Sequence, residues 1–293
     1  MFASSSRINL GPTAALLYSA FFWGVVWYPL RLLEAQGLTG IWQTLASFLV
    51  AAVLFLPFVY KGFQGWREQP WSLMFMMLAI GWTNIAFVLA MLHGEVVRVL
   101  LLFYLSPLWT AILGRWLVHE PWTGKTFLLL GLGLGGAVIT LWEPTLHHKP
   151  LDFADILALT AGFSFATSNV LNRRMTVITV HAKTGASLVG VVLISAAIIV
   201  VMAEPWPQVD ASTWAWSGVL GVLGFLLASL TAIYGFTHMP AQRASVIILS
   251  EIIVGAISAW ALANEYISLQ ELFGGALIVS AGLVASFSSE EKV

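Results

Sequence analysis

The residue best suited to chemistry in this chain is Glu251, a carboxylate near the middle of the apolar stretch 242–262. In a helix that spans a membrane, this position lies roughly 15 Å from either end at ~1.5 Å per residue. A carboxylate at that depth is costly unless it is protonated, paired or in contact with water. It either exchanges protons, or binds the ammonium group of a ligand, or hydrogen-bonds in protonated form between helices.

Neutral polar side chains in two other apolar stretches add hydrogen-bond donors and acceptors: Asn84, Ser168, Asn169 and Asn172. Ser168 and Asn172 are four residues apart and therefore share one face of a helix. Amides and hydroxyls at this depth suit the carboxylate and ammonium groups of an amino acid. They serve equally well as hydrogen bonds that hold membrane helices together.

A further polar group lies where a proline interrupts the stretch 96–114. Tyr104, Ser106 and Trp109 fall within two helical turns, and Pro107 frees a backbone carbonyl one turn earlier. A freed carbonyl that faces a cavity binds a polar group, whereas the same proline also produces a simple kink. Ser250 occupies the corresponding place beside Glu251 and joins this candidate site.

Aromatic residues are abundant, with 14 Trp and 18 Phe. Those at the ends of apolar stretches are typical of membrane-interface anchors. Those that lie deeper either pack in the core or form the wall of a binding cavity; the cavity candidates are Trp23, Trp27, Tyr28, Trp109 and Tyr234. At one end of the stretch 96–114, a gate is predicted from His93, Glu95 and Arg98, although charged side chains at helix ends also snorkel to the headgroups.

The composition defines the surroundings of these residues. Hydrophobic residues make up 59% and charged residues 9% of the 293 positions, with a mean hydropathy of +0.88. This excludes a soluble surface and makes the lipid bilayer the solvent. The balance of 13 basic and 14 acidic residues argues against nucleic acid as a partner. With no cysteine, no spaced set of metal ligands and no phosphate-binding loop, the sequence predicts neither a metal nor a cofactor nor an enzyme.

A spanning helix needs about 20 mostly apolar residues. Ten stretches meet this requirement, near 13–33, 41–60, 71–92, 96–114, 124–142, 153–173, 184–203, 213–236, 242–262 and 269–287. We therefore predict an all-α polytopic membrane protein with ten transmembrane helices.

Basic residues predict the orientation, because cytoplasmic loops accumulate Lys and Arg. With the N-terminus inside, only three lie at the outer face, Arg31, Arg98 and Lys149. The others lie at the cytoplasmic face: Arg7, Lys61, Arg67, Arg115, Lys125, Arg173, Arg174, Lys183, Arg243 and Lys292. Both termini are thus predicted in the cytoplasm.

The two halves of the chain repeat each other. Trp23-Gly24 precedes Arg31 at the same spacing at which Phe165-Ala166 precedes Arg173. A second pair of motifs consists of Ser106-Pro107, Trp116 and Glu120, then Ser250-Glu251, Trp260 and Glu265. We predict five-helix repeats over 13–142 and 153–287. Because five is odd, the second repeat enters the membrane inverted, which favours a binding site at the midplane.

These motifs, with a glycine-rich stretch at 124–142, resemble the drug/metabolite transporter superfamily and, within it, the EamA-type exporters. The run from Phe22 to Pro29 is most similar to bacterial exporters of aromatic amino acids. One departure is Glu251, which stands where the first half has Pro107. The resemblance implies a central cavity lined by the first, third, fourth, sixth, eighth and ninth helices, with the fifth and tenth packed outside.

The resemblance implies a secondary transporter of the bacterial inner membrane. It would export amino acids, including aromatic ones, and related small metabolites from the cytoplasm by alternating access, with or without coupling to protons. The alternative substrates are cationic drugs, nucleobases or sugars. The sequence does not define the oligomeric state.

Overall fold

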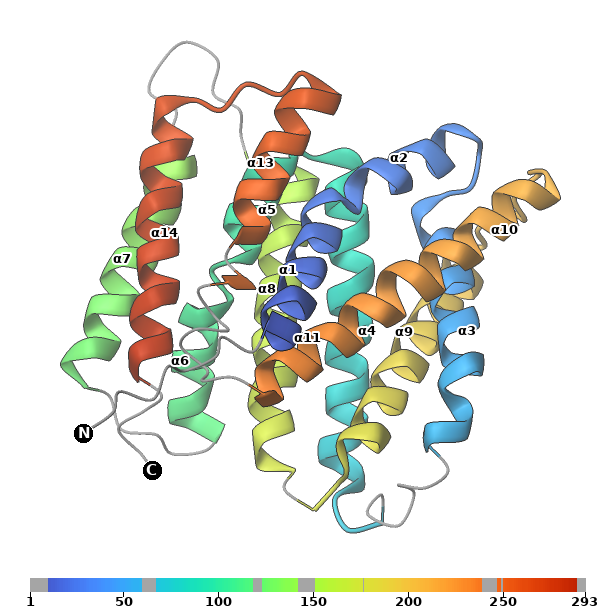
Figure 1. The fold of residues 1–293 in the computed structure, drawn as a ribbon, viewed down its shortest axis with the longest axis horizontal. Coiled ribbons are helices and arrows are strands. Elements are labelled where there is room, and N and C mark those ends of the chain that lie inside the picture. Colours follow the sequence, from blue (N-terminus) through green and yellow to red (C-terminus); the bar gives the residue numbers. More distant parts are fainter. Residues whose placement is uncertain are drawn as a thin grey trace.

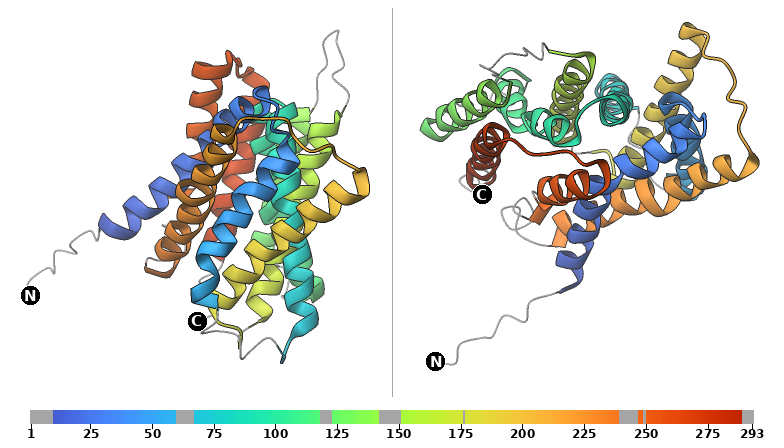
Figure 2. Two further views of the ribbon diagram at one scale, coloured as in Figure 1. Left: turned by 90° about the vertical axis from the view of Figure 1, so that its right-hand side faces the viewer. Right: turned by 90° about the horizontal axis from the view of Figure 1, so that it is seen from above.

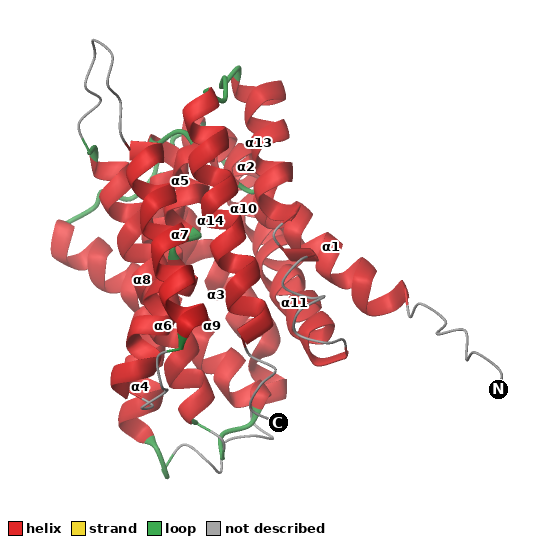
Figure 3. Cartoon of the chain, turned by 90° about the vertical axis from the view of Figure 1, so that its left-hand side faces the viewer, coloured by secondary structure: helices red, strands yellow, loops and turns green. Residues whose placement is uncertain are grey.

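The computed structural model describes residues 10–59, 67–117, 123–141, 151–175, 177–238, 247–248 and 250–288. The regular elements among them are helices (Figure 3). In the first half these are α1 (Leu10–Val25), α2 (Trp27–Ala35), α3 (Gly40–Val59), α4 (Pro70–His93), α5 (Val96–Phe103), α6 (Ser106–Leu117) and α7 (Gly124–Leu141). In the second half they are α8 (Phe153–Arg174), α9 (Val180–Met202), α10 (Ala211–Val219), the π-helix η2 (Leu220–Leu226), α11 (Leu227–His238), α13 (Ser250–Ala263) and α14 (Leu269–Ser288).

Seven segments are long and apolar enough to cross a membrane: Gly11–Ala35, Gly40–Phe58, Pro70–His93, Val96–Leu117, Phe153–Asn172, Val180–Met202 and Ala211–Gly235. Three shorter apolar helices, Gly124–Ile139, Ser250–Ala263 and Leu269–Val284, coincide with the remaining predicted stretches. The all-helical membrane architecture is therefore confirmed, while the number of ten spans stays a prediction. The predicted stretch 242–262 begins in residues outside the described part, and α13 covers its remainder.

Some spans consist of more than one helix, for a local reason. In Val96–Leu117, Pro107 has no N–H to donate to the carbonyl of Phe103, and the helix is interrupted at Tyr104 and Leu105. The carbonyl oxygen of Phe103 instead faces Gly162 of α8, where an added Cβ would lie 2.8 Å from it. The freed carbonyl thus lies at a close contact between helices and not at a cavity. Of the two roles considered for Pro107, this geometry corresponds to the simple kink.

The helices pack mostly across the two halves of the chain. α7 lies against α14, α4 against α8 and α9, α3 against α9, and α1 against α11 and α13 (Figure 1). α7 and α14 stand together at one edge of the bundle (Figure 2). Their close approach depends on Gly136, where a Cβ would lie 2.6 Å from the carbonyl oxygen of Gly274. This agrees with the expectation that these two glycine-rich helices pack outside the others.

Aromatic rings fill the middle of the bundle. Trp23 of α1 contacts Phe87 of α4 and Phe225 of η2, with ring centroids 6.0 and 5.7 Å apart. Phe87 contacts Phe103, and Phe103 contacts Tyr104, at 4.9 and 6.0 Å. These pairs all have the edge-to-face arrangement that aromatic rings prefer. The chain of rings therefore leads from α1 through α4 to the interruption between α5 and α6.

Candidate functional site

The site is built around Glu251, a carboxylate that is buried in the protein. Glu251 lies in the first turn of α13 and is 6% exposed. The hydroxyl of Tyr104 donates a hydrogen bond of 2.8 Å to its Oε2 atom. Tyr104 reaches it from the interruption between α5 and α6, so a tyrosine of the first half meets a carboxylate of the second half.

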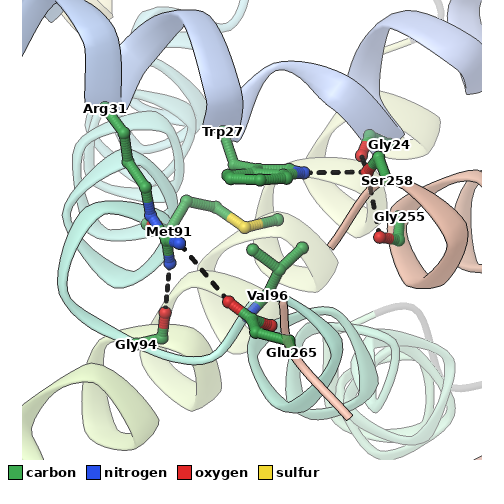
Figure 4. A network of polar contacts seen from close by, with 9 residues as sticks. All are labelled: Gly24, Trp27, Arg31, Met91, Gly94, Val96, Gly255, Ser258 and Glu265. Carbon is green, nitrogen blue, oxygen red and sulfur yellow. Dashed lines mark hydrogen bonds and ion pairs between the residues drawn. The ribbon is translucent and has the colours of Figure 1, made fainter. Parts of the chain in front are cut away.

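The position of Glu251 is fixed by close packing of α13 on α1. A Cβ added at Gly24 would lie 2.8 Å from the backbone oxygen of Glu251, so only glycine fits there. Two turns further on, Ser258 donates its hydroxyl to the Gly24 carbonyl over 3.1 Å and accepts a hydrogen bond of 2.9 Å from Nε1 of Trp27 (Figure 4). These bonds use backbone and side-chain groups of α1 to hold α13 in register.

The predicted cavity aromatics occupy different surroundings. Trp23 packs in the aromatic core, and Trp27 is 1% exposed with its Nε1 already bonded. Tyr28 and Tyr234 are exposed. Trp109 differs from these, because its ring packs on Phe163 while its Nε1 is buried without a hydrogen-bond partner among the described residues. Among the described aromatic candidates, Trp109 is therefore the one whose buried N–H group has no hydrogen-bond acceptor.

The neutral polar candidates mostly bond to their own helices. Asn84 donates to the carbonyl of Ile80, Ser168 to that of Phe165, and Ser250 to that of Ile247. Ser106 is buried where α6 begins, and its carbonyl accepts from Thr110.

Ser168 and Asn172 were predicted to share one face of a helix, but their surroundings differ. Ser168 is buried, whereas Asn172 is exposed at the end of α8. Asn169 is partly buried. The structure thus brings Tyr104 and Glu251 together and does not show the remaining polar candidates converging on them.

The predicted gate residues have different partners. Arg98 is 8% exposed and binds Asp155 of α8 through two hydrogen bonds of 2.7 Å, Nε to Oδ1 and Nη2 to Oδ2. His93 and Glu95 are exposed beside it.

Sequence reasoning missed Asp155, although a signal was present. The side chains of Asp152 and Asp155 exchange hydrogen bonds with each other's backbone N–H in a capping box at the start of α8. Sequence reasoning also missed that Arg31 pairs with Glu265, although both lie in the repeated motifs.

A groove of about 410 Å³ is lined by residues of α4, α6 and α8. Its lining is apolar apart from Ser164 and Thr167, and it includes none of the predicted site residues. These helices belong to the third, fourth and sixth predicted spans, three of those expected to line a central cavity, and the cavity itself stays a prediction.

Among the described residues, no three His, Asp or Glu side chains are grouped so as to hold a metal ion.

The helices long enough to span a membrane, with a carboxylate buried between the two halves of the chain, indicate a polytopic membrane protein of the transporter class. The chain belongs to the EamA-like transporter family, which it matches over residues 12–142 and again over 152–287. It is therefore a membrane transporter of small molecules, not an enzyme.

Two curated proteins are similar to it. An uncharacterized transporter of Archaeoglobus fulgidus is 27% identical over 205 residues, which are 69% of this chain and 72% of that protein. An S-adenosylmethionine uptake transporter of Rickettsia bellii is 24% identical over 255 residues, 84% of this chain and 83% of that protein. A crystal structure at 17% identity has a TM-score of 0.60 and shares the fold over 94% of this chain and 96% of its own.

Proposed function

We propose that this protein exports amino acids, including aromatic ones, and related small metabolites by alternating access between two inverted five-helix repeats. The observation that carries the proposal is the hydrogen bond between Tyr104 and Glu251. It joins the two halves of the chain through an ionisable group in a predicted membrane span, where such a group is costly without a function or a partner.

The helix contacts support the repeat. If each half is superposed on the other, the packing of α4 on α8 corresponds to that of α11 on α1, and α6 on α8 corresponds to α13 on α1. The pairs α7 with α14 and α3 with α9 correspond to themselves. A pattern of this kind is expected from two copies related by a pseudo-two-fold axis, and an odd number of spans in each copy makes the copies antiparallel.

The substrate is inferred from the groups at hand. The carboxylate of Glu251 suits an ammonium group, and the free Nε1–H of Trp109 suits a carboxylate. The neighbouring rings of Phe103 and Tyr104 suit an apolar or aromatic side chain.

A second candidate is the export or facilitated transport of a cationic metabolite or drug. The observation in its favour is that the buried ionisable partner at the site is acidic. The relative named for S-adenosylmethionine adds weight, because that compound carries both an amino-acid group and a sulfonium cation. Nucleobases and sugars stay as further alternatives, since neither needs a carboxylate partner.

Protons are the proposed coupling ion, with Glu251 as the coupling residue. A carboxylate that binds either a proton or a substrate ammonium group, and not both, exchanges one for the other as the halves rock. Within this mechanism the hydroxyl of Tyr104 holds Oε2 in place. We further propose that the protein lies in the bacterial inner membrane with both termini in the cytoplasm, as the basic residues indicate.

The test is counterflow in proteoliposomes with labelled amino acids, S-adenosylmethionine, nucleobases and sugars, each with and without a pH gradient. We expect exchange of amino acids that the gradient accelerates and that Glu251→Gln abolishes. Glu68→Gln, which changes an exposed carboxylate, is the matched control and should transport normally. Exchange of another substrate class alone would overturn the amino-acid assignment, and full activity of Glu251→Gln would overturn the role of that residue.

A further inference from the structure

A second pair of charged residues joins the halves at the end of the bundle where α2, the start of α5 and the end of α13 lie (Figure 1). Nη1 of Arg31 lies 3.3 Å from Oε1 of Glu265. The same guanidinium donates to the carbonyls of Gly94 and Met91, over 2.6 and 3.1 Å. The other oxygen of Glu265 accepts the backbone N–H of Val96 over 2.9 Å (Figure 4).

Both charges also satisfy helix ends. α4 ends at His93, and Arg31 binds carbonyls at that C-terminus. α5 begins at Val96, and Glu265 binds the N–H at that N-terminus. A cation at a helix C-terminus and an anion at an N-terminus each interact favourably with the exposed backbone groups. The turn between α4 and α5 is therefore bound from α2 on one side and from the segment after α13 on the other.

The ion pair lies next to the packing of α1 on α13. The guanidinium carbon of Arg31 is 4.9 Å from the centre of the Trp27 ring, a favourable cation–π distance. Trp27 in turn donates to Ser258 of α13. The Arg31–Glu265 pair thus lies beside Trp27 and Met91, both fully buried (Figure 4).

The two ion pairs between the halves, Arg31 with Glu265 and Arg98 with Asp155, differ in how deeply they are buried. The side chains of Arg98 and Asp155 are 10% and 2% exposed and share two short hydrogen bonds. Those of Arg31 and Glu265 are 28% and 17% exposed and share one long bond. A buried pair is costly to separate, whereas water replaces much of the energy of a partly exposed one.

We propose that Arg31 and Glu265 form a reversible latch that closes the pathway at this end of the bundle and opens to admit or release substrate. The inference rests on the alternating access proposed above. Arg98 and Asp155 stay paired as the fixed connection between α5 and α8, and the turn at Gly94 to Val96 moves relative to α2 or α13.

The chain contains no cysteine, so a single introduced thiol serves as the reporter. Met91→Cys places it at a fully buried position beside the latch, and Met175→Cys places it at an equally buried position at the end of α8. Membrane vesicles of both orientations are treated with a membrane-impermeant maleimide. The variants Arg31→Gln and Glu265→Ala, which remove the contacts of the pair with each other and with the turn, are introduced into each reporter protein, singly and together.

We expect the thiol at position 91 to react about three- to tenfold faster, from one side of the membrane, in either single variant. The double variant should react no faster than the single ones, because each removes the same pair. The thiol at position 175 should be unaffected. An unchanged rate at position 91, additive effects in the double variant, or equal acceleration at both positions would each overturn the latch.

This readout does not depend on the substrate. If the variants change labelling while the protein exchanges no amino acid, the amino-acid proposal fails and the latch stands. If amino-acid exchange is observed while labelling at position 91 is the same in all variants, the latch fails and the proposed function stands.

Discussion

Arg98 and Asp155, which are far apart in the sequence, form a bidentate ion pair that is almost completely buried, with both hydrogen bonds 2.7 Å long. The pair connects the start of α5 to the start of α8 and therefore the first half of the chain to the second. Asp155 also belongs to the capping box of α8, so the ion pair is anchored in the backbone of that helix.

The first prediction concerns this pair. Arg98→Gln leaves the carboxylate of Asp155 buried without its cation, and this should destabilise the protein by about 3–5 kcal/mol. The measurement is the thermal unfolding of the purified protein in detergent. Arg174→Gln, which changes an exposed arginine of α8, should unfold like the parent protein.

The double variant Arg98→Met/Asp155→Asn should recover part of the stability lost in Arg98→Gln, because no charge remains buried. An Arg98→Gln protein that unfolds at the parental temperature would show that the pair contributes nothing to the folded state.

The second prediction concerns the hydroxyl of Tyr104. Tyr104→Phe keeps the ring against Phe103 but removes the hydrogen bond to Glu251. A hydrogen bond to a charged group contributes about 1.5–3 kcal/mol, so the apparent affinity for substrate should fall at least about tenfold. The concentration dependence of counterflow measures this, with Tyr266→Phe, an exposed tyrosine, as the control. Equal affinities would mean that Tyr104 does not position Glu251 for binding.

The extents of the helices were predictable because they depend on local properties. Apolar stretches bounded by glycine, proline and polar residues indicate membrane helices regardless of what packs on them. The need of Glu251 for a proton, a partner or water followed from its depth in such a stretch. The interruption at Tyr104 followed from Pro107, because a proline affects its own turn of the helix.

The partners of the charged and polar groups were not predictable in the same way. Tyr104 with Glu251, and Arg31 with Glu265, come from opposite halves of the chain, and no local pattern defines which side chains meet there. The face shared by Ser168 and Asn172 was also insufficient, because exposure changes along α8 as the helix leaves the bundle. Glu120 and the side chain of Arg173, which correspond to Glu265 and Arg31 in the repeat, lie outside the described residues.

The third prediction concerns the close contact of α8 with the chain just before the interruption at Tyr104. In Gly162→Ala the new methyl group would lie 2.8 Å from the carbonyl oxygen of Phe103, so the helices must separate. We expect lower thermal stability and slower transport. Gly135→Ala is the matched control, since nothing lies within 4 Å of its Cβ and alanine favours the helix by about 0.5–1 kcal/mol. If both variants behaved alike, the close contact would have no role.

The fourth prediction concerns pH at the latch. Burial raises the pKa of the Glu265 carboxyl, against the opposing effects of Arg31 and the Val96 N–H, while Glu95 nearby raises it further. In an open latch the carboxyl is solvated and its pKa returns towards the ordinary value of 4.5. Glu265 therefore binds its proton more tightly in the closed form than in the open form. The difference matters at pH values between the pKa of the open form and the raised pKa of the closed form.

Closure should consequently become more favourable as the pH falls through that window, and opening more favourable as the pH rises through it. The sign is opposite to that expected from the ion pair alone, which protonation of Glu265 would break. Labelling of Met91→Cys, normalised to that of Met175→Cys at each pH, should slow as the pH is lowered. Glu265→Gln should abolish this dependence because the amide does not titrate. Faster normalised labelling at low pH would show instead that the attraction of Arg31 outweighs the cost of burying the carboxylate.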